Sequence, residues 1–238
     1  MRMGALAMAA CLAFSAAAEE GKEKRPMDPA LAPVADEPGL PRVLLIGDSI
    51  SIGYTLPVRA MLKGKANVHR PPTNCGPTTT GLKELDAWLG EGKWDVIHFN
   101  WGLHDLKYVD ERGALVPVER GRQQVPLDQY EQNLDALAVR LKKTGAKLIW
   151  AATTPVPEGA QGRVPGDEVK YNAAARRVME KHGVAINDLH AFASQFTGYK
   201  AIQMERNVHF MKAGSVELAR QVAAHILKAL GKPPAEER

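Results

Sequence analysis

An unbroken apolar run at 43–46 leads directly into Gly47-Asp48-Ser49, and this stretch constrains the fold more than any other. Such a run is typical of a strand buried on both faces, as in a parallel sheet. Gly47 permits a sharp turn, and Asp48 and Ser49 favour a helix start, so we expect a helix at about 50–63. Because ligands of open α/β sheets bind at the carboxyl ends of the strands, Ser49 is expected at the binding edge.

Ser49 has two interpretations at this position. Serine and aspartate before a helix commonly cap it with their side chains, which is a purely structural role. The same position places a hydroxyl beside free N–H groups and the positive end of a helix dipole, which suit a developing oxyanion. The rest of the chain decides between these two interpretations.

Downstream of this stretch, strand patterns alternate with amphipathic helix patterns. Further strands are expected at 66–69, 94–100, 147–152 and 184–186. Further helices are expected at 81–89, 127–143, 167–182 and 213–230. This alternation predicts an α/β fold, a three-layer α/β/α sandwich with a mostly parallel five-stranded sheet of flavodoxin-like type.

The segments between these elements include several long loops. They lie at 70–80, 102–126, 153–166 and 197–212. Loops of more than a dozen residues are unusual in compact domains and are often functional. We expect these loops to gather at the same edge of the sheet as Ser49.

The N-terminus is typical of a secretory signal. Arg2 precedes a short apolar stretch, and the three alanines at 16–18 offer a cleavage site. The apolar stretch is too short to span a bilayer, so no stable membrane insertion is expected. These features predict a periplasmic or secreted protein. A lipoprotein with its lipid attached at Cys11 is an alternative, although the apolar run before Cys11 is very short.

The remaining boundaries follow from composition. Residues 1–18 are assigned to the signal peptide, and residues 19–41, rich in Glu, Lys, Pro and Ala, to a flexible linker. The domain is expected at 42–232, followed by a tail at 233–238.

Charge and cysteine content exclude some functions. The net charge is +4, and the basic residues are spread along the chain, so no nucleic-acid partner is expected. The absence of a Cys/His cluster or an i,i+4 His pair predicts no metal and no cofactor. Cys75 would be the lone cysteine after cleavage, with no disulfide partner. The oligomeric state is left open.

Four motifs, in a fixed order along the chain, indicate a function. Gly-Asp-Ser at 47–49 is followed by Asn-Cys-Gly at 74–76, by Gly-Leu-His-Asp at 102–105 and by His209 just before the last expected helix. In this order the chain resembles the SGNH hydrolases, also called GDSL-type esterases, over nearly all of 42–230. The resemblance implies the SGNH hydrolase fold and a serine ester hydrolase.

The resemblance also implies roles for individual residues. Ser49 matches the nucleophile, and its backbone N–H would be one oxyanion donor. Gly76 matches the glycine whose N–H is a second donor, and His209 matches the general base. A serine hydroxyl is a weak nucleophile that needs an adjacent base, and histidine titrates near neutrality, so this pair suits acyl transfer.

Two positions depart from the family pattern. His104 stands where the family has an asparagine that is the third oxyanion donor, and an imidazole can also donate an N–H. The family's aspartate three residues before the histidine is replaced by Arg206, which cannot orient an imidazole as an acid does. Glu205 is the candidate orienting acid, and Asp188 is another. Otherwise a backbone carbonyl would orient His209 in a Ser-His dyad.

Three residues near these motifs have structural interpretations. His98 lies within an apolar strand pattern and is expected to be a core histidine. Asp105 is expected to brace the turn at 102–105. Trp101 is either a substrate platform or part of the core.

The sequence therefore predicts an exported serine esterase that hydrolyses small acyl esters, with acetyl groups on carbohydrate favoured by the resemblance. Other small esters would need only a different pocket. A glycan acyltransferase is an alternative, because it uses the same acyl-enzyme. A catalytically impaired glycan-binding module is the other alternative, and it is suggested by the departures at His104 and Arg206.

Overall fold

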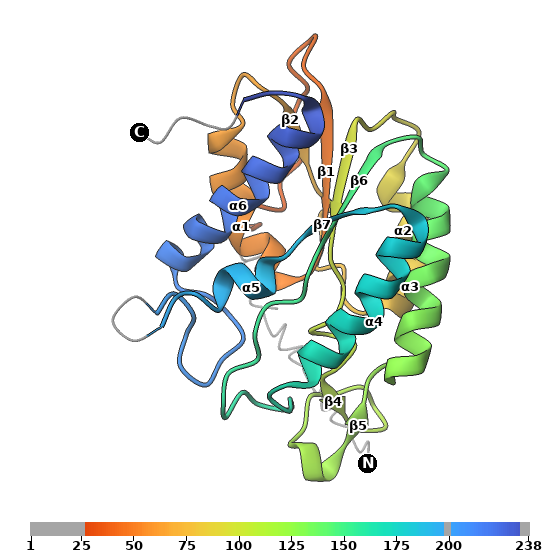
Figure 1. The fold of residues 1–238 in the computed structure, drawn as a ribbon, viewed down its shortest axis with the longest axis vertical. Coiled ribbons are helices and arrows are strands. Elements are labelled where there is room, and N and C mark those ends of the chain that lie inside the picture. Colours follow the sequence, from red (N-terminus) through yellow and green to blue (C-terminus); the bar gives the residue numbers. More distant parts are fainter. Residues whose placement is uncertain (1–26, 198–200, 234–238) are drawn as a thin grey trace, which may run out of the picture.

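The computed structural model describes residues 27–197 and 201–233, so the expected signal peptide lies outside the described residues (Figure 1). All five strands of the main sheet are parallel, in the order β2-β1-β3-β6-β7. These strands are β1 (Arg42–Ile46), β2 (Asn67–His69), β3 (Val96–Phe99), β6 (Lys147–Ala151) and β7 (Ala185–Asn187).

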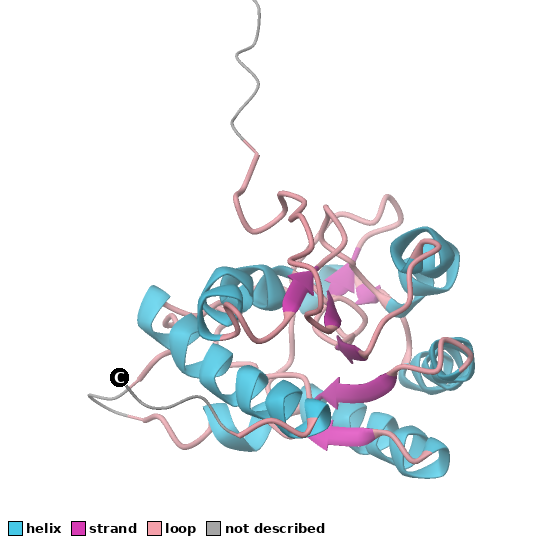
Figure 2. Cartoon of the chain, turned by 90° about the horizontal axis from the view of Figure 1, so that it is seen from above, coloured by secondary structure: helices cyan, strands magenta, loops and turns pink. Residues whose placement is uncertain are grey.

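Helices cover both faces of the sheet, as the views in Figures 1 and 2 show. On one side lie α1 (Ser49–Met61), α6 (Lys212–Leu230) and the short α5 (Leu189–Ala193). On the other side lie α2 (Thr78–Leu89), α3 (Leu127–Lys142) and α4 (Asp167–His182). The predicted three-layer α/β/α sandwich is therefore confirmed. The expected helices differ from the observed ones by a few residues at their ends, and α5 was not expected.

The strand order places the end of β1 at a topological switch point. In sheet order the strands run second, first, third, fourth and fifth along the chain, so the chain goes from β1 to β2 on one side and then crosses back to β3 on the other. Ile46 pairs in register with Phe99, so β1 and β3 end at the same level. The turn that carries Ser49 and the loop that follows β3 consequently emerge side by side, at the edge where such folds bind ligands.

Both faces of β1 are buried in the core. The apolar residues at 43–46 are at most 1% exposed, as expected for a strand covered on both faces. Trp101 is also fully buried, and its indole packs so closely on Gly81 that a Cβ there would lie 2.8 Å from the ring. Trp101 is thus part of the core and not a substrate platform. His98 is a core histidine, with its Nε2 3.1 Å from Asn187 Nδ2.

The segment expected as a loop at 102–126 contains additional structure. A short antiparallel pair forms between β4 (Tyr108–Val109) and β5 (Arg122–Gln123). A single 3₁₀ turn, η1 (Val118–Arg120), lies between them. Strands of two residues are too short to produce an alternating pattern that sequence could show.

The described part of the expected flexible linker packs against the domain. The Arg59 guanidinium donates to two carbonyls of residues 27–41, over 3.2 and 3.3 Å. Asn67 exchanges two hydrogen bonds with the backbone of Glu37, at 2.9 and 3.0 Å. This packing differs from the expectation of a flexible tether. The contacts come from single polar residues distant in sequence, which composition does not indicate.

Asp105 ties the loop after β3 to the helical layer. Its Oδ1 accepts hydrogen bonds from the Thr78 N–H (2.8 Å) and hydroxyl (2.5 Å) at the start of α2. Asn133 of α3 donates to the same hydroxyl over 3.0 Å. Asp105 was expected to brace the turn at 102–105, and its side chain instead joins this loop to the start of α2. Asp105 is fully buried, and this burial raises the pKa of its carboxyl from 3.8 to about 7, although the bonds from Thr78 oppose the rise.

This buried carboxyl predicts a pH-dependent stability. The unfolded chain releases the Asp105 proton near its ordinary pKa, whereas the folded chain holds it to about pH 7. Between these values the folded state binds more protons, so the free energy of unfolding falls as pH rises, with a slope approaching about 1.4 kcal/mol per pH unit. Urea unfolding of the wild type and of Asp105→Asn, at several values between about pH 4.5 and 7.5, isolates this effect in their difference. A difference that does not vary with pH would contradict the assignment.

Candidate active site

Asp48, and not Ser49, caps helix α1. The Asp48 carboxylate is buried, and its Oδ1 accepts the Ile50 N–H over 2.9 Å. Ser49 is the first residue of the helix, so its N–H has no intrahelical acceptor. The structure therefore leaves both the hydroxyl and the backbone N–H of Ser49 available at the carboxyl end of β1.

The Ser49 hydroxyl meets His209 across the site. The distance from Ser49 Oγ to His209 Nε2 is 2.9 Å, although the two residues are 160 positions apart. His209 lies in the loop before α6, and this loop is closed by backbone bonds from Met204 N to His209 O and from Met211 N to Ile202 O, both 2.9 Å. The imidazole is exposed and the serine is half-buried, so the pair faces solvent.

Asn207 fixes the tautomer of His209. Asn207 Oδ1 lies 3.0 Å from the backbone nitrogen of His209 and 2.7 Å from its Nδ1. The atom that accepts a backbone N–H must be the amide oxygen, so Nδ1 must donate to it. Nε2 is then left unprotonated, with its lone pair available to the Ser49 hydroxyl. This is the tautomer that a general base for serine requires.

The candidate acids do not contact His209. Glu205 is exposed and, with Arg206, lines an open groove of about 730 Å³ beside the 157–159 loop. Asp188 caps α5 through Ala191 N (2.9 Å) and pairs with Arg176 (2.7 Å). The prediction of Glu205 as the orienting group is corrected to Asn207.

A local sequence signal for this role exists. An asparagine often accepts the N–H two residues later in an Asx turn, and here that turn also brings its oxygen to the ring of His209. Arg206 precedes the turn with a φ of +54°, which non-glycine residues seldom adopt. The orienting asparagine thus lies two residues before the histidine, and the family's acid would lie three residues before it.

Arg70 holds the turn that carries the serine. Arg70 as a whole residue is only 7% exposed. Its five hydrogen bonds run to Pro71 O (3.2 Å), Thr73 O (3.1 Å), Gly47 O (3.2 Å), Ser51 Oγ (3.1 Å) and Thr55 Oγ1 (3.0 Å). No carboxylate lies within 4 Å of it in the part of the chain that the structure describes. Arg70 thus joins the Gly47 turn, the first turns of α1 and the loop after β2.

Cys75 makes a further hydrogen bond to the same turn. Its backbone N–H donates to Gly47 O over 3.2 Å, so the loop at 70–76 lies directly against the serine turn. The thiol is buried, and this burial raises its pKa to about 11. A thiol with so high a pKa is a poor nucleophile at neutral pH, which agrees with a structural role for Cys75.

Gly76 lies in this loop, with its N–H already bonded. The N–H donates to Asn74 Oδ1 over 3.0 Å, and the residue has a φ of +59°, which favours glycine. Gly76 is therefore near the serine turn, as expected from the motif. Its N–H could donate to a substrate oxygen only after its hydrogen bond to Asn74 Oδ1 is broken. The motif that contains Gly76 does not indicate that this donor is occupied.

His104 lies in the charged surroundings of the site. Its ring is half-buried, and burial lowers the pKa of the imidazole, while the Asp48 carboxylate partly opposes this shift. Lys107, Arg163 and His209 lower the pKa further, because each disfavours a second positive charge. His104 is consequently neutral near pH 7 and presents one N–H, as an oxyanion donor would.

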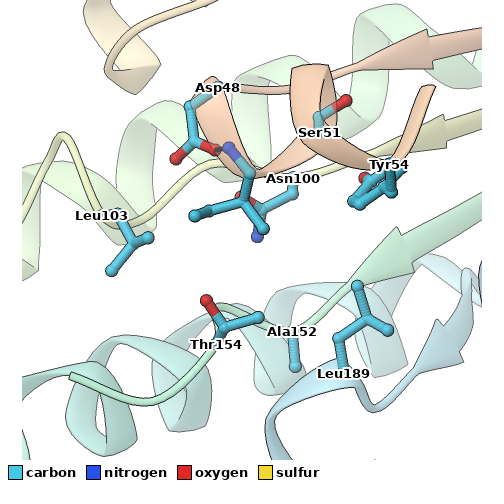
Figure 3. Close-up of a pocket in the computed structure, with 9 residues that line it drawn as sticks. Asp48, Ser51, Tyr54, Asn100, Leu103, Ala152, Thr154 and Leu189 are labelled. Carbon is cyan, nitrogen blue, oxygen red and sulfur yellow. Dashed lines mark hydrogen bonds between the residues drawn. The ribbon is translucent and has the colours of Figure 1, made fainter. Parts of the chain in front are cut away.

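A small cavity lies beneath the serine turn (Figure 3). Asp48, Ser51 and Tyr54 line one side of it, and Thr154, Ala152 and Leu189 line the other. The space open to the centre of a water molecule is about 10 Å³, which is room for about one water. The Thr154 hydroxyl is buried without a protein partner, so such a water has polar groups to bind. This cavity is too small for an acyl chain, and Ser49 is not among the residues that line it.

Residues 27–197 and 201–233 contain neither a candidate metal site nor a candidate membrane span. No group of three or more His, Cys, Asp or Glu side chains is arranged to hold a metal ion in these ranges. None of the helices described there is both long enough and apolar enough to cross a membrane.

Solved structures with the same fold include several ester hydrolases. An acetyl xylan esterase, AlAXEase, is 16% identical, with a TM-score of 0.63 over 78% of this chain and 99% of that one. A lipase/acylhydrolase from Enterococcus faecalis is 18% identical, with a TM-score of 0.65 over 83% and 100%. A catalytic mutant of Axe2, an acetylxylan esterase from Geobacillus stearothermophilus, is 18% identical, with a TM-score of 0.64 over 83% and 97%.

Comparisons of sequence alone give no match, either to a protein-family model or to a curated protein. At 16–18% identity, the structural likeness establishes the fold. It agrees with the fold that the resemblance to SGNH hydrolases implied.

The buried guanidinium of Arg70 predicts a large cost for its replacement. Arg70→Lys keeps the charge but cannot supply five donors in a planar fork, so several buried acceptors lose their partners. We expect the free energy of unfolding in urea to fall by about 3 kcal/mol. Arg112→Lys, at an exposed position, is the matched control. A loss below about 0.5 kcal/mol in Arg70→Lys, as for ordinary surface substitutions, would show that the hydrogen bonds of Arg70 contribute little to stability.

Proposed function

We propose that this protein is a serine ester hydrolase in which Ser49 is the nucleophile and His209 the general base. The observation that carries the proposal is the 2.9 Å hydrogen bond between Ser49 Oγ and His209 Nε2, with Nδ1 of the same ring held by Asn207. A serine activated by a correctly oriented imidazole is the arrangement that acyl transfer needs.

The mechanism follows from this geometry. Ser49 Oγ attacks the ester carbonyl carbon while His209 Nε2 takes the hydroxyl proton. The tetrahedral intermediate collapses, the bond to the alcohol breaks, and Nε2 returns the proton to the departing alcohol oxygen. Water then attacks the acyl-enzyme with the same proton transfers, releasing the carboxylic acid and free Ser49.

The oxyanion of the intermediate needs fixed donors. We assign the Ser49 N–H, which has no intrahelical acceptor, and an N–H of the neutral His104 ring. The Gly76 N–H completes the set if the substrate oxygen displaces Asn74 Oδ1 from it. Removing one donor from such a set typically lowers the rate by about 10²–10³.

The orienting group is an amide in place of a carboxylate. Asn207 holds the ring and its tautomer, but a neutral amide stabilises the imidazolium less than a negative charge does. The chemistry therefore depends on orientation more than on charge at this position. A missing acid need not abolish activity, because the oxyanion donors and binding retain much of the rate.

The substrate we propose is a small acyl ester, in particular an acetyl ester on carbohydrate. The Ser49–His209 pair faces solvent, and an open groove runs beside the loop that carries His209, so a polymer could lie across the site. Two of the structures with this fold are acetylxylan esterases. The predicted signal peptide supports a periplasmic or secreted location, where such polymers occur.

Replacing the nucleophile gives the most direct kinetic test. With p-nitrophenyl acetate and residues 19–238, we expect Ser49→Ala to lose at least about 10³-fold in kcat/KM, because no hydroxyl remains to form the acyl-enzyme. Glu205→Gln is the matched control and should stay within about twofold of the parent, since Glu205 does not contact His209. Circular dichroism checks that each variant is folded.

Two results would contradict this proposal. Undiminished hydrolysis by Ser49→Ala would exclude the mechanism. An inactive parent that a fluorophosphonate also fails to label would favour a glycan-binding module, because only an activated serine reacts with that reagent.

Asn207 provides a separate test of the orienting role. Asn207→Ala should lower kcat by about 10–10² with little change in KM, because the ring loses its fixed tautomer but not its contacts with substrate. Asn207→Asp keeps an oxygen that can accept from the backbone N–H and from Nδ1 of His209, and it adds a negative charge. It should raise kcat above that of the parent and move the acid limb of the pH–rate profile to higher pH. A kcat for Asn207→Ala within twofold of the parent would rule out this role.

A further inference from the structure

Arg163 presents unused hydrogen-bonding capacity beside the site. It lies in the long loop after β6, where its Nε donates to Leu103 O over 3.2 Å and its Nη1 to Gln161 O over 3.3 Å. Nη2 makes no hydrogen bond to any residue that the structure describes. Because Leu103 immediately precedes His104, the guanidinium is fixed against the segment that carries a proposed oxyanion donor.

Lys107 is a second cation in the same place. The loops that carry Lys107 and Arg163 are joined by a backbone bond from Tyr108 N to Gly162 O, at 2.8 Å. Lys107 is half-buried, and its ammonium makes no hydrogen bond or ion pair within the described ranges. Burial lowers the pKa of both side chains, and for Lys107 the charge of Arg163 lowers it further.

The nearby carboxylates leave an excess of positive charge here. The charge of Asp48 raises the pKa of Arg163 and of His104, but its Oδ1 caps α1. Asp105 directs its carboxyl to Thr78 and not to these cations. Neither Arg163 nor Lys107 forms an ion pair within 4 Å among the described residues. Asp48, the one carboxylate whose charge acts on Arg163, therefore already has another partner, and Lys107 has no carboxylate among the influences on its pKa.

Half-burying a cation without a counterion is unfavourable, so two such cations beside the segment that carries His104 are candidates for binding an anion. On the basis of the proposed esterase function, we propose that the substrate carries an oxyanionic group, a carboxylate or a phosphate, that binds between Arg163 and Lys107. The enzyme would then prefer acyl esters of acidic sugars to those of neutral sugars.

The two side chains suit this task in different ways. The planar guanidinium of Arg163 can donate from Nη2 in a fixed direction, and a charged pair of this kind forms short, strong hydrogen bonds with carboxylate or phosphate. The Lys107 ammonium is a compact charge on a flexible chain, which can follow the anion. Because part of the attraction acts through solvent, the preference should weaken as salt rises.

The test compares matched substrates. We would measure kcat/KM for an O-acetylated methyl galacturonoside and for the corresponding uronamide, which differs only in charge. We expect the acid to be preferred by at least about tenfold, as for one charge-assisted interaction of about 1.4 kcal/mol. An O-acetylated sugar phosphate is the third arm, and a larger preference for it would identify phosphate as the anion.

Variants assign the preference to the two cations. Arg163→Gln and Lys107→Gln should each reduce the ratio of kcat/KM for acid over amide by about tenfold. Lys143→Gln makes the same charge change at an exposed residue after α3, at the opposite edge of the sheet, and should leave the ratio unchanged. Equal losses for acid and amide in Arg163→Gln would assign it only to bracing Leu103 and would overturn the proposal.

The remaining outcomes separate this proposal from the esterase function. Equal hydrolysis of acid and amide by the parent would overturn the anion site and leave the esterase intact. If no ester is hydrolysed, calorimetric titration with sodium galacturonate still decides the matter. If the parent binds galacturonate and Arg163→Gln does not, the anion site is supported even without catalysis. If the parent does not bind galacturonate, the anion site is overturned.

Discussion

The five hydrogen bonds of the buried Arg70 guanidinium are the constraint on which the rest of the site depends. They reach Gly47 on one side of the serine turn, Ser51 and Thr55 in α1, and the loop after β2. A buried guanidinium is tolerated only when its donors are satisfied, so these acceptors are held in one arrangement. Ser49 is thereby fixed at the edge of the sheet, and the loop with Gly76 is kept beside it. His209 then needs only its own Asx turn to bring Nε2 within 2.9 Å of the hydroxyl.

The orienting residue illustrates what such a site requires physically. The imidazole needs an acceptor at Nδ1, fixed in position, so that Nε2 is free to accept a proton. Asn207 meets this need with one oxygen that is held by a backbone N–H and bound to the ring. The departure at Arg206 therefore removes a charge without removing the orientation. Arg163 and Lys107, in the loops next to His104, add the positive charge on which the proposed anion site rests.

Much of the fold could be predicted because it rests on local patterns. The apolar run at 43–46 predicts a doubly covered strand, and alternating strand and helix patterns predict the parallel sheet; both are observed. The pairing of Ser49 with His209 rests on the order of motifs and on the rule that parallel strands end at one edge. Contacts between distant polar residues were not predictable in this way. Arg70 looks like an ordinary surface cation in the sequence, and its burial follows from acceptors in several separate segments. The same holds for Arg163 and for the packing of residues 27–41, while the bond from the Gly76 N–H to Asn74 depends on loop geometry that composition does not encode.

The most direct test of the central claim is to trap the covalent intermediate. Residues 19–238 would be mixed with excess p-nitrophenyl acetate, quenched in acid within one turnover, digested and analysed by mass spectrometry, with His209→Ala treated in parallel. The mechanism predicts an acetyl group on the peptide that contains Ser49, at high occupancy in the parent and at greatly reduced occupancy in His209→Ala. An unmodified Ser49 during rapid hydrolysis, or equal acetylation of the two proteins at this residue, would contradict a serine activated by His209.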